Sequence, residues 1–270
     1  MDRLALEFIS ALGMPPVQYV DLAARLGISR IGFAPSPIAA NPHNYPAWDL
    51  RNDPALLRDT KAAMSANNVT VSLGEGFLIM PGLEIADAAA AMDAMAELGA
   101  PLVNTIVMEQ DRPRAFDQFA RYAEMADARG MLACLEYMPM MWPINVHEAA
   151  AFVIESGAAN ARVLIDAMHF YRGGSQAVDL ARVDPALIGY VQICDVPMPA
   201  TNPDYGMEAR DNRLAPGEGD LPLAELLAAL PRDVTIGLEL PMAARAEAGM
   251  GPEERLAPAI AAARALLAAN

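Results

Sequence analysis

Lysine and positive charge are scarce in this sequence. Lysine and arginine together account for 19 of the 270 residues, against 34 aspartates and glutamates, so the formal net charge is −15. A surface this acidic repels phosphate backbones, so we expect no nucleic-acid partner. Lys61 is the only lysine, and it lies in a polar helical pattern. That position argues against an enzyme that forms a Schiff base through lysine.

Cysteines, long apolar runs and targeting segments are also scarce. Cys134 and Cys194 are the only cysteines, and both fall in apolar stretches typical of strands, which predicts reduced core thiols rather than a disulfide. No apolar run approaches the ~20 residues that a membrane-spanning helix requires. The N-terminal stretch MDRLALEFIS lacks the apolar core and cleavage site of a secretory signal. We therefore expect a cytoplasmic protein with no membrane partner.

Nucleotide-binding motifs are missing as well. No GxGxxG follows the first apolar run, and GxxxxGK[ST] occurs nowhere, which counts against nucleotide-binding open sheets. What the chain does contain is apolar material: 54% of its residues are hydrophobic and 20% are charged. That composition supports a large core and argues against extensive disorder. The length suits one (β/α)₈ barrel, which typically needs about 250 residues, although two smaller domains are possible on length alone.

Short apolar runs alternate with longer helical patterns along the chain. The predicted strands are Leu4–Phe8, Arg30–Phe33, Thr70–Leu73, Val103–Met108, Leu132–Tyr137, Val163–Asp166, Gly189–Cys194 and Val234–Leu240. The predicted helices are Pro15–Leu26, Pro54–Asn67, Glu84–Leu98, Pro113–Arg129, His147–Ser156, Leu221–Leu230 and Pro252–Ala268. This order predicts a parallel α/β sheet, either closed or open and doubly wound. We favour a single (β/α)₈ TIM barrel over residues 1–270.

Three predicted strands are followed by long connections. These connections are Ala34–Asp53, Met138–Val146 and Val196–Asp220. They lie at the C-terminal ends of the strands, where barrel enzymes build their active sites, and long loops there often serve as lids. Ordinary surface insertions are the alternative.

Polar residues end four consecutive predicted strands, where a buried strand should be apolar. They are Glu136, Asp166, Gln192 and Glu239. Burying a lone carboxylate is unfavourable, and three at one rim repel each other unless a cation lies between them. We therefore predict a divalent-metal site at the C-terminal ends of the strands. The alternative is a set of salt bridges to arginines such as Arg172, Arg210 and Arg213.

The segments around these residues resemble the sugar phosphate isomerase/epimerase superfamily, the xylose isomerase-like barrels. The resemblance covers nearly the whole chain and is densest in LEYMP (135–139), IDAMHFYRGG (165–174), VQICDVP (191–197), RLAPGEGDLPL (213–223) and GLELP (237–241). That superfamily includes ketose 3-epimerases, inosose dehydratases and dehydroshikimate dehydratases. It also includes a trinuclear zinc endonuclease group, which three histidines and an acidic charge argue against here.

The resemblance implies a ligand set. Glu136, Asp166 and Glu239 match the family's acidic metal ligands, and Gln192 stands where many members have histidine. An all-oxygen shell favours Mn²⁺ or Mg²⁺ over Zn²⁺, so we expect one such ion, bound with modest affinity. Loss of the metal is the alternative. His169 matches the histidine that contacts substrate.

Other residues are candidates for substrate contacts. Arg172 has a planar fork that suits a carboxylate or phosphate, with a surface ion pair as the alternative. Related barrels place an arginine near the PGEGD turn, so we expect Arg210 or Arg213 to contact substrate. His43 and Trp48 lie in the loop after the second strand and could close over a ligand.

Three further groups carry weaker predictions. Glu7 and Asn104 could bind substrate hydroxyls, or they could be hydrogen-bonded core residues. Met138, Met140 and Met141 could form an apolar wall beside Glu136, because the thioether packs adaptably.

The resemblance implies enolate chemistry on a small polyhydroxylated carbonyl compound. In the leading hypothesis the chain is a metal-dependent isomerase or epimerase, in which Glu136 and Glu239 exchange a proton on opposite faces of an enediolate that His169 stabilises. The alternative is a dehydratase of a keto-cyclitol or a dehydroshikimate-like compound. A non-catalytic sugar-binding barrel is a third hypothesis. Family habit implies a homodimer or homotetramer.

Overall fold

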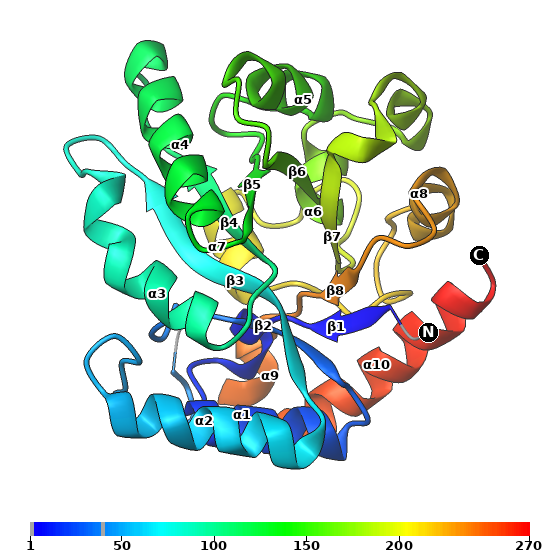
Figure 1. Ribbon diagram of the computed structural model, residues 1–270. Helices are drawn as coiled ribbons and strands as arrows, with labels where there is room; N and C mark the ends of the chain where they lie inside the picture. Colours follow the sequence, from blue (N-terminus) through cyan, green and yellow to red (C-terminus); the bar gives the residue numbers. More distant parts are fainter. Residues whose placement is uncertain (1–2, 39–40) are drawn as a thin grey trace.

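A computed structural model of the chain describes residues 3–38 and 41–270. Within these residues, eight parallel strands pair in chain order and close into a barrel (Figure 1). The strands are β1 (Leu4–Leu6), β2 (Arg30–Phe33), β3 (Thr70–Ile79), β4 (Leu102–Val107), β5 (Leu132–Glu136), β6 (Ala161–Asp166), β7 (Ile188–Ile193) and β8 (Ile236–Leu238). This is the TIM barrel that the alternating pattern predicts.

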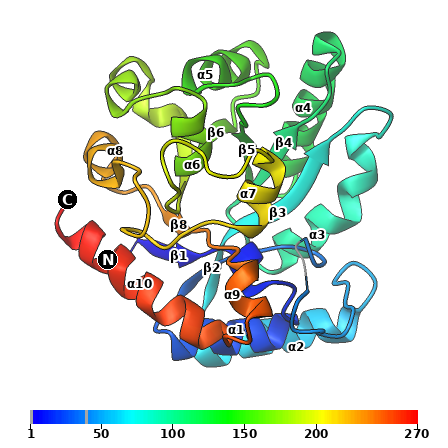
Figure 2. The same ribbon diagram turned by 180° about the vertical axis from the view of Figure 1, so that it is seen from behind.

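The main helices surround the barrel and cover its outer face (Figures 1 and 2). They are α1 (Pro16–Arg25), α2 (Pro54–Asn67), α3 (Ala89–Glu97), α4 (Arg112–Asp127), α5 (Val146–Glu155), α8 (Leu223–Ala229) and α10 (Pro252–Ala268). The bounds of α2 and α10 agree with the prediction. The predicted helix Glu84–Leu98 is divided into the 3₁₀ turn η2 (Ile85–Ala88) and α3.

Side-chain caps explain where several helices begin. The Asp53 carboxylate accepts a hydrogen bond from the Leu56 amide at the start of α2, and Pro54 provides a first residue that needs no amide partner. The Asp111 carboxylate accepts from the Arg114 amide at the start of α4. These caps determine where the two helices begin. In the sequence, the same positions are marked by an aspartate followed by a proline within two residues.

Short helices add detail that the sequence pattern does not show. They are η1 (Phe8–Ala11), α6 (Ala167–Arg172), η3 (Ala177–Arg182), η4 (Pro185–Leu187), α7 (Tyr205–Asp211) and α9 (Ala243–Glu247). Each is too short for a helical hydrophobic period to be visible. The helix α7 lies across the barrel beside β3 and β4 in both views (Figures 1 and 2), so the loop after β7 covers part of the barrel mouth.

The registers of the last strands bring polar side chains to one level. Asp166 pairs with Gln192 across β6 and β7, and Gln192 pairs with Gly237 across β7 and β8. Beneath this level a buried apolar cluster fills the barrel, formed by Leu73, Leu102, Cys134, Leu164 and Tyr190. Both cysteines are free and buried, as the sequence predicts.

Strand β3 runs six residues beyond the predicted end at Leu73, to Ile79. Its register with β4 shifts between Gly74 and Phe77, and Gly76 has a φ of +91°, a conformation that favours glycine. The irregularity leaves Glu75 buried rather than exposed. A bulge of this kind commonly aims a side chain at a functional site.

None of the helices in the described residues combines the length and the apolar character that a membrane crossing requires.

Candidate active site

A cavity of about 620 Å³ opens at the C-terminal ends of the strands. Its polar lining includes Glu75, Asn104, Glu136, His169, Tyr205, Arg210, Arg213 and Glu239. Its apolar lining includes Phe77, Ile106, Met108 and the predicted wall of Met138, Met140 and Met141. The face of the barrel where the sequence predicts an active site therefore carries a cavity lined by titratable side chains.

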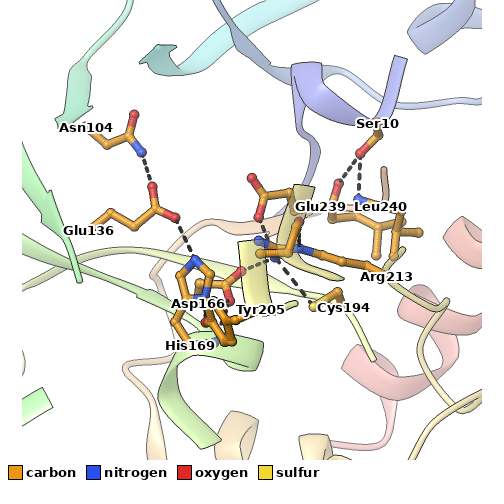
Figure 3. Close-up of polar contacts among 12 residues, drawn as sticks. Ser10, Asn104, Glu136, Asp166, His169, Cys194, Tyr205, Arg213, Glu239 and Leu240 are labelled. Carbon is orange, nitrogen blue, oxygen red and sulfur yellow. Dashed lines mark hydrogen bonds and ion pairs between the residues drawn. The ribbon is translucent and has the colours of Figure 1, made fainter. Parts of the chain in front are cut away.

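Glu136, the last residue of β5, is held from two sides. Asn104 donates a hydrogen bond from Nδ2 to its Oε2 over 2.5 Å, and His169 Nε2 lies 3.5 Å from its Oε1. All three side chains are buried, and Figure 3 shows Glu136 between the other two. The carboxylate is thereby fixed at the cavity wall.

His169 is oriented by three neighbours. Its backbone amide donates to Asp166 Oδ1 over 2.8 Å at the start of α6. Its Nδ1 contacts the Tyr205 hydroxyl, while its Nε2 faces Glu136. Burial raises the pKa of Tyr205, so its hydroxyl keeps its proton at neutral pH.

Arg213 lies between two carboxylates (Figure 3). One guanidinium nitrogen, Nη1, is 2.5 Å from Asp166 Oδ2 and 2.5 Å from Glu239 Oε2. Burial alone would lower the pKa of Arg213, but the two anions outweigh it and raise that pKa. The salt-bridge alternative of the sequence analysis is thus realised for Asp166 and Glu239. Arg213 is also one of the predicted substrate contacts, and it lines the cavity.

Gln192 lies beside this ion pair with an unsatisfied amide. Its Oε1 and Nε2 are both buried and have no hydrogen-bond partner among the described residues. Buried polar groups are nearly always hydrogen-bonded, so a buried amide without a partner suits a residue that binds an added group. The sequence predicts Gln192 as a site residue from its place near a strand end. It does not predict that the amide lacks hydrogen-bond partners.

The four predicted ligands carry donor atoms that suit a divalent metal. The guanidinium of Arg213, however, occupies the space between Asp166 and Glu239. Three carboxylates and an amide oxygen are hard donors of the kind that Mg²⁺ and Mn²⁺ prefer, and the orphaned Gln192 carbonyl suits that use. Over residues 3–38 and 41–270, however, no three His, Cys, Asp or Glu side chains lie together closely enough to hold an ion. The metal site stays a prediction.

Arg210 lines the cavity, but its guanidinium pairs with Asp211 at 3.0 Å and is largely exposed. Arg172 does not line the cavity: its Nη2 donates to Glu208 Oε1 and to the Pro197 carbonyl, each over 2.8 Å. That guanidinium ties α6 to the loop after β7. The structure therefore gives Arg172 a structural contact where the sequence predicts a substrate contact.

In the loop after β2, Ile38 lines the cavity, but the two residues predicted to contact substrate do not. Trp48 Nε1 donates to the Gly13 carbonyl over 3.2 Å, and its ring meets Phe8 edge-on at 5.5 Å. The ring of His43 packs against Tyr45 at 5.5 Å. Neither His43 nor Trp48 is part of the cavity lining, because the loop packs against the core near η1.

Two polar residues of the cavity lining were not predicted from the sequence. Tyr205 lies in α7, within a connection that has no periodic pattern. Glu75 stands between Gly74 and Gly76, which look like the residues of a turn. A carboxylate two residues after the end of a predicted strand was the one available signal for Glu75.

The family profile of the xylose isomerase-like TIM barrel matches residues 20–266. The chain belongs to this family. No curated protein matches the sequence at a significant level.

Solved structures of xylose isomerase-like barrels superpose over nearly the full chain. The IolI protein with a bound zinc atom has a TM-score of 0.79 at 16% identity, covering 98% of each chain. The probable 3-DHS dehydratase AsbF of Bacillus anthracis has a TM-score of 0.72 at 14% identity, covering 95% of this chain and 97% of its own. D-psicose 3-epimerase of Clostridium cellulolyticum, solved with D-tagatose, has a TM-score of 0.70 at 15% identity, covering 98% and 99%. At these identities the likeness shows the fold alone.

Proposed function

We propose that this barrel is a metal-dependent isomerase or epimerase of a small polyhydroxylated carbonyl compound. The observation that carries the proposal is the pair Glu136 and Glu239. Glu136 ends β5 and Glu239 directly follows β8, three strands apart around the barrel, and both line one cavity. Two carboxyl groups on different sides of a substrate suit a reaction that removes a proton on one face and returns it on the other.

Glu136, Asp166, Gln192 and Glu239 would hold the metal, which we expect to be Mn²⁺ or Mg²⁺ rather than Zn²⁺ because every donor is oxygen. When bound, the ion would supply positive charge to the oxygens of a carbonyl and its neighbouring hydroxyl.

The protein's own groups divide the proton transfer between them. Glu136 is fixed by Asn104 and serves as the base that removes the proton next to the carbonyl. Burial and the neighbouring anions Asp166 and Glu136 raise the pKa of Glu239 well above its usual range, against the opposing effect of Arg213. A raised pKa suits Glu239 to return a proton on the other face of the substrate.

His169 is placed to stabilise charge on the substrate. Its ring is held between Tyr205 and Glu136 and lines the cavity, so it can donate a hydrogen bond to an oxygen that becomes negative. The methionine wall at residues 138, 140 and 141 excludes water from the same region, which strengthens these electrostatic interactions.

A dehydratase is the second candidate. The same carbanion chemistry can expel a β-hydroxyl as water if an acid protonates the leaving oxygen. Glu239, whose pKa is raised, could serve as this acid. A probable 3-DHS dehydratase shares the fold of this chain.

Proton exchange in D₂O tests both candidate functions, the isomerase or epimerase and the dehydratase. The protein with Mn²⁺ is incubated with D-fructose, D-tagatose, D-psicose, an inosose and 3-dehydroshikimate, and the products are followed by NMR. Deuterium on the carbon next to the carbonyl without loss of water supports the epimerase. An unsaturated product supports the dehydratase. Absence of exchange with every compound contradicts the proposed function.

A further inference from the structure

Two buried glutamates outside the Asp166–Arg213–Glu239 ion pairs face each other inside the barrel. Glu7 directly follows β1 and is 0% exposed; Glu75 lies in β3 and is 4% exposed. A Cβ added to Gly32 on β2 would overlap oxygens of both carboxyl groups, and a Cβ on Gly237 would overlap Glu7. The barrel wall makes room for this acid pair with two glycines, so the pair is built into the fold.

The hydrogen bonds around the pair leave one oxygen unsatisfied. Tyr190 donates from its hydroxyl to Glu7 Oε1 over 2.7 Å, and the Phe8 amide donates to Glu75 Oε1 over 2.8 Å. Glu7 Oε2 is buried and has no partner among the described residues. Two carboxylates this close cannot both be ionised away from water. A single proton on the pair removes the repulsion, and it can point either at Glu7 Oε2 or at a hydroxyl group in the cavity.

Electrostatics agree with this arrangement. Burial raises the pKa of Glu7 to about 8, although the hydrogen bond from Tyr190 opposes the rise. Burial and the neighbouring Glu7 raise the pKa of Glu75 well above its usual range. The other titratable groups that act on the pair are Tyr19, Glu136 and Glu239. The pair keeps at least one proton at neutral pH.

Glu75 also lines the cavity, and so does Asn104 on the next strand. Asn104 uses its Nδ2 to hold Glu136, but its Oδ1 is buried without a partner among the described residues, and the side chain is 5% exposed. The β3–β4 wall therefore presents an acid and an unsatisfied acceptor side by side. The proton transfer described above uses Asn104 only through its Nδ2, and it uses neither Asn104 Oδ1 nor Glu75.

We propose that Glu75, sharing a proton with Glu7, and Asn104 form a second polar subsite that binds an uncharged hydroxyl group of the substrate. The proposal rests on the proposed function, since it takes the same cavity as the substrate site. A hydroxyl both donates and accepts hydrogen bonds, as a half-protonated acid pair does. Phosphate or carboxylate at this end would meet buried negative charge, so the substrate is neutral there.

Infrared spectroscopy of the ligand-free protein tests the shared proton without any substrate. The wild type and the exposed control E97Q should show the carbonyl band of a protonated carboxyl at neutral pH, with and without Mn²⁺. E75Q and E7Q should each lose intensity in this band, because the introduced amide donates a hydrogen bond and lets the remaining carboxyl ionise. A band of equal intensity in all four proteins contradicts the shared proton.

Steady-state kinetics test whether the subsite binds a hydroxyl group of the substrate. For any compound that exchanges deuterium with the wild type, E75Q should raise KM roughly tenfold and change kcat much less, because a contact made before and during reaction is lost. Among the monodeoxy analogues of that compound, one should have the same KM with both proteins. An equal response of every analogue to E75Q contradicts the subsite. If E75Q does not fold, E7Q takes its place, since an ionised Glu75 cannot donate.

Calorimetry separates this proposal from the proposed function. If no compound exchanges deuterium, D-psicose and D-fructose are titrated into the wild type and E75Q. Binding that E75Q weakens supports the subsite although the enzymatic proposal has failed. Binding of equal strength, or none to either protein, contradicts the subsite. Exchange by the wild type with an unchanged KM in E75Q contradicts the subsite and leaves the proposed function standing.

Discussion

Replacing Arg213 with methionine tests the claim that its guanidinium acts as an internal cation. Asp166 and Glu239 each lie 2.5 Å from Arg213 Nη1, and Arg213 is 4% exposed. Removing one partner of a buried ion pair leaves an uncompensated charge and destabilises a protein by about 3–5 kcal/mol. For a chain of this size each kcal/mol lowers Tm by about 2–4 °C. We therefore expect R213M to melt roughly 6–20 °C below the wild type.

The assay is thermal unfolding by circular dichroism in EDTA, followed by titration with Mn²⁺. R210M is the matched control, because Arg210 lies in the same loop with its side chain 61% exposed. It should melt within about 1–2 °C of the wild type, since exposed pairs contribute little. Mn²⁺ should raise the Tm of R213M by more than that of the wild type, because binding stabilises the native state and the ion no longer competes with a guanidinium.

The pH dependence provides a second check on the same variant. Burial would raise the pKa of Asp166, but Arg213 and His169 outweigh it and lower that pKa below its ordinary value of 3.8. The pairing therefore stabilises the fold above that ordinary value and is lost as pH falls through the lower folded value. The stability gap between wild type and R213M should shrink as the pH falls in this acidic range. Equal melting in EDTA, or equal gains from Mn²⁺, would refute the reasoning.

Three other substitutions test the site. Q192H replaces an oxygen donor with imidazole, so stoichiometric zinc should replace Mn²⁺ or Mg²⁺ in metal analysis of the purified variant; unchanged metal content would contradict a role for Gln192 as ligand. E136Q should slow deuterium exchange roughly 10²–10⁴-fold, the usual contribution of a general base, while far-UV circular dichroism stays unchanged; exchange at the wild-type rate would remove Glu136 from the mechanism. Y205F removes the hydroxyl at His169 Nδ1, and we expect roughly a tenfold loss in kcat, with A209G as a control on the same helix; an unaltered kcat would leave Tyr205 a packing role only.

The barrel itself could be predicted because most strands are short and apolar and alternate with longer helical patterns. Strand ends were harder, and β3 shows why. Gly74 and Gly76 read as turn residues, whereas the structure uses them to form a bulge within the strand. Glycine permits both outcomes, and only the pairing with β4 decides between them. Glu75 was missed as a cavity residue for this reason.

The candidate site could be predicted where it lies on strands and not where it lies on loops. Glu136 ends β5, Asp166 ends β6, and Gln192 lies one residue before the end of β7. The order of the strands alone therefore places them at one rim. The side chains of Arg172 and Trp48 depend on how loops fold. Both side chains donate hydrogen bonds to backbone carbonyls outside the cavity lining. Such tertiary contacts produce no periodic pattern in the sequence, so the sequence does not predict them.

The two acidic clusters at this end of the barrel neutralise their charge in different ways, and under the proposed function this difference would orient a substrate. At Asp166 and Glu239 the compensating charge is a cation, now Arg213. At Glu7 and Glu75 it is a shared proton, because no cationic side chain is among the groups that shift their pKa values. A polarised carbonyl is best stabilised next to positive charge, whereas a hydroxyl needs only a group that donates and accepts. Under the proposed function, the carbonyl of a substrate would therefore lie at the β6–β8 side, and its uncharged hydroxyl end at the β3–β4 wall.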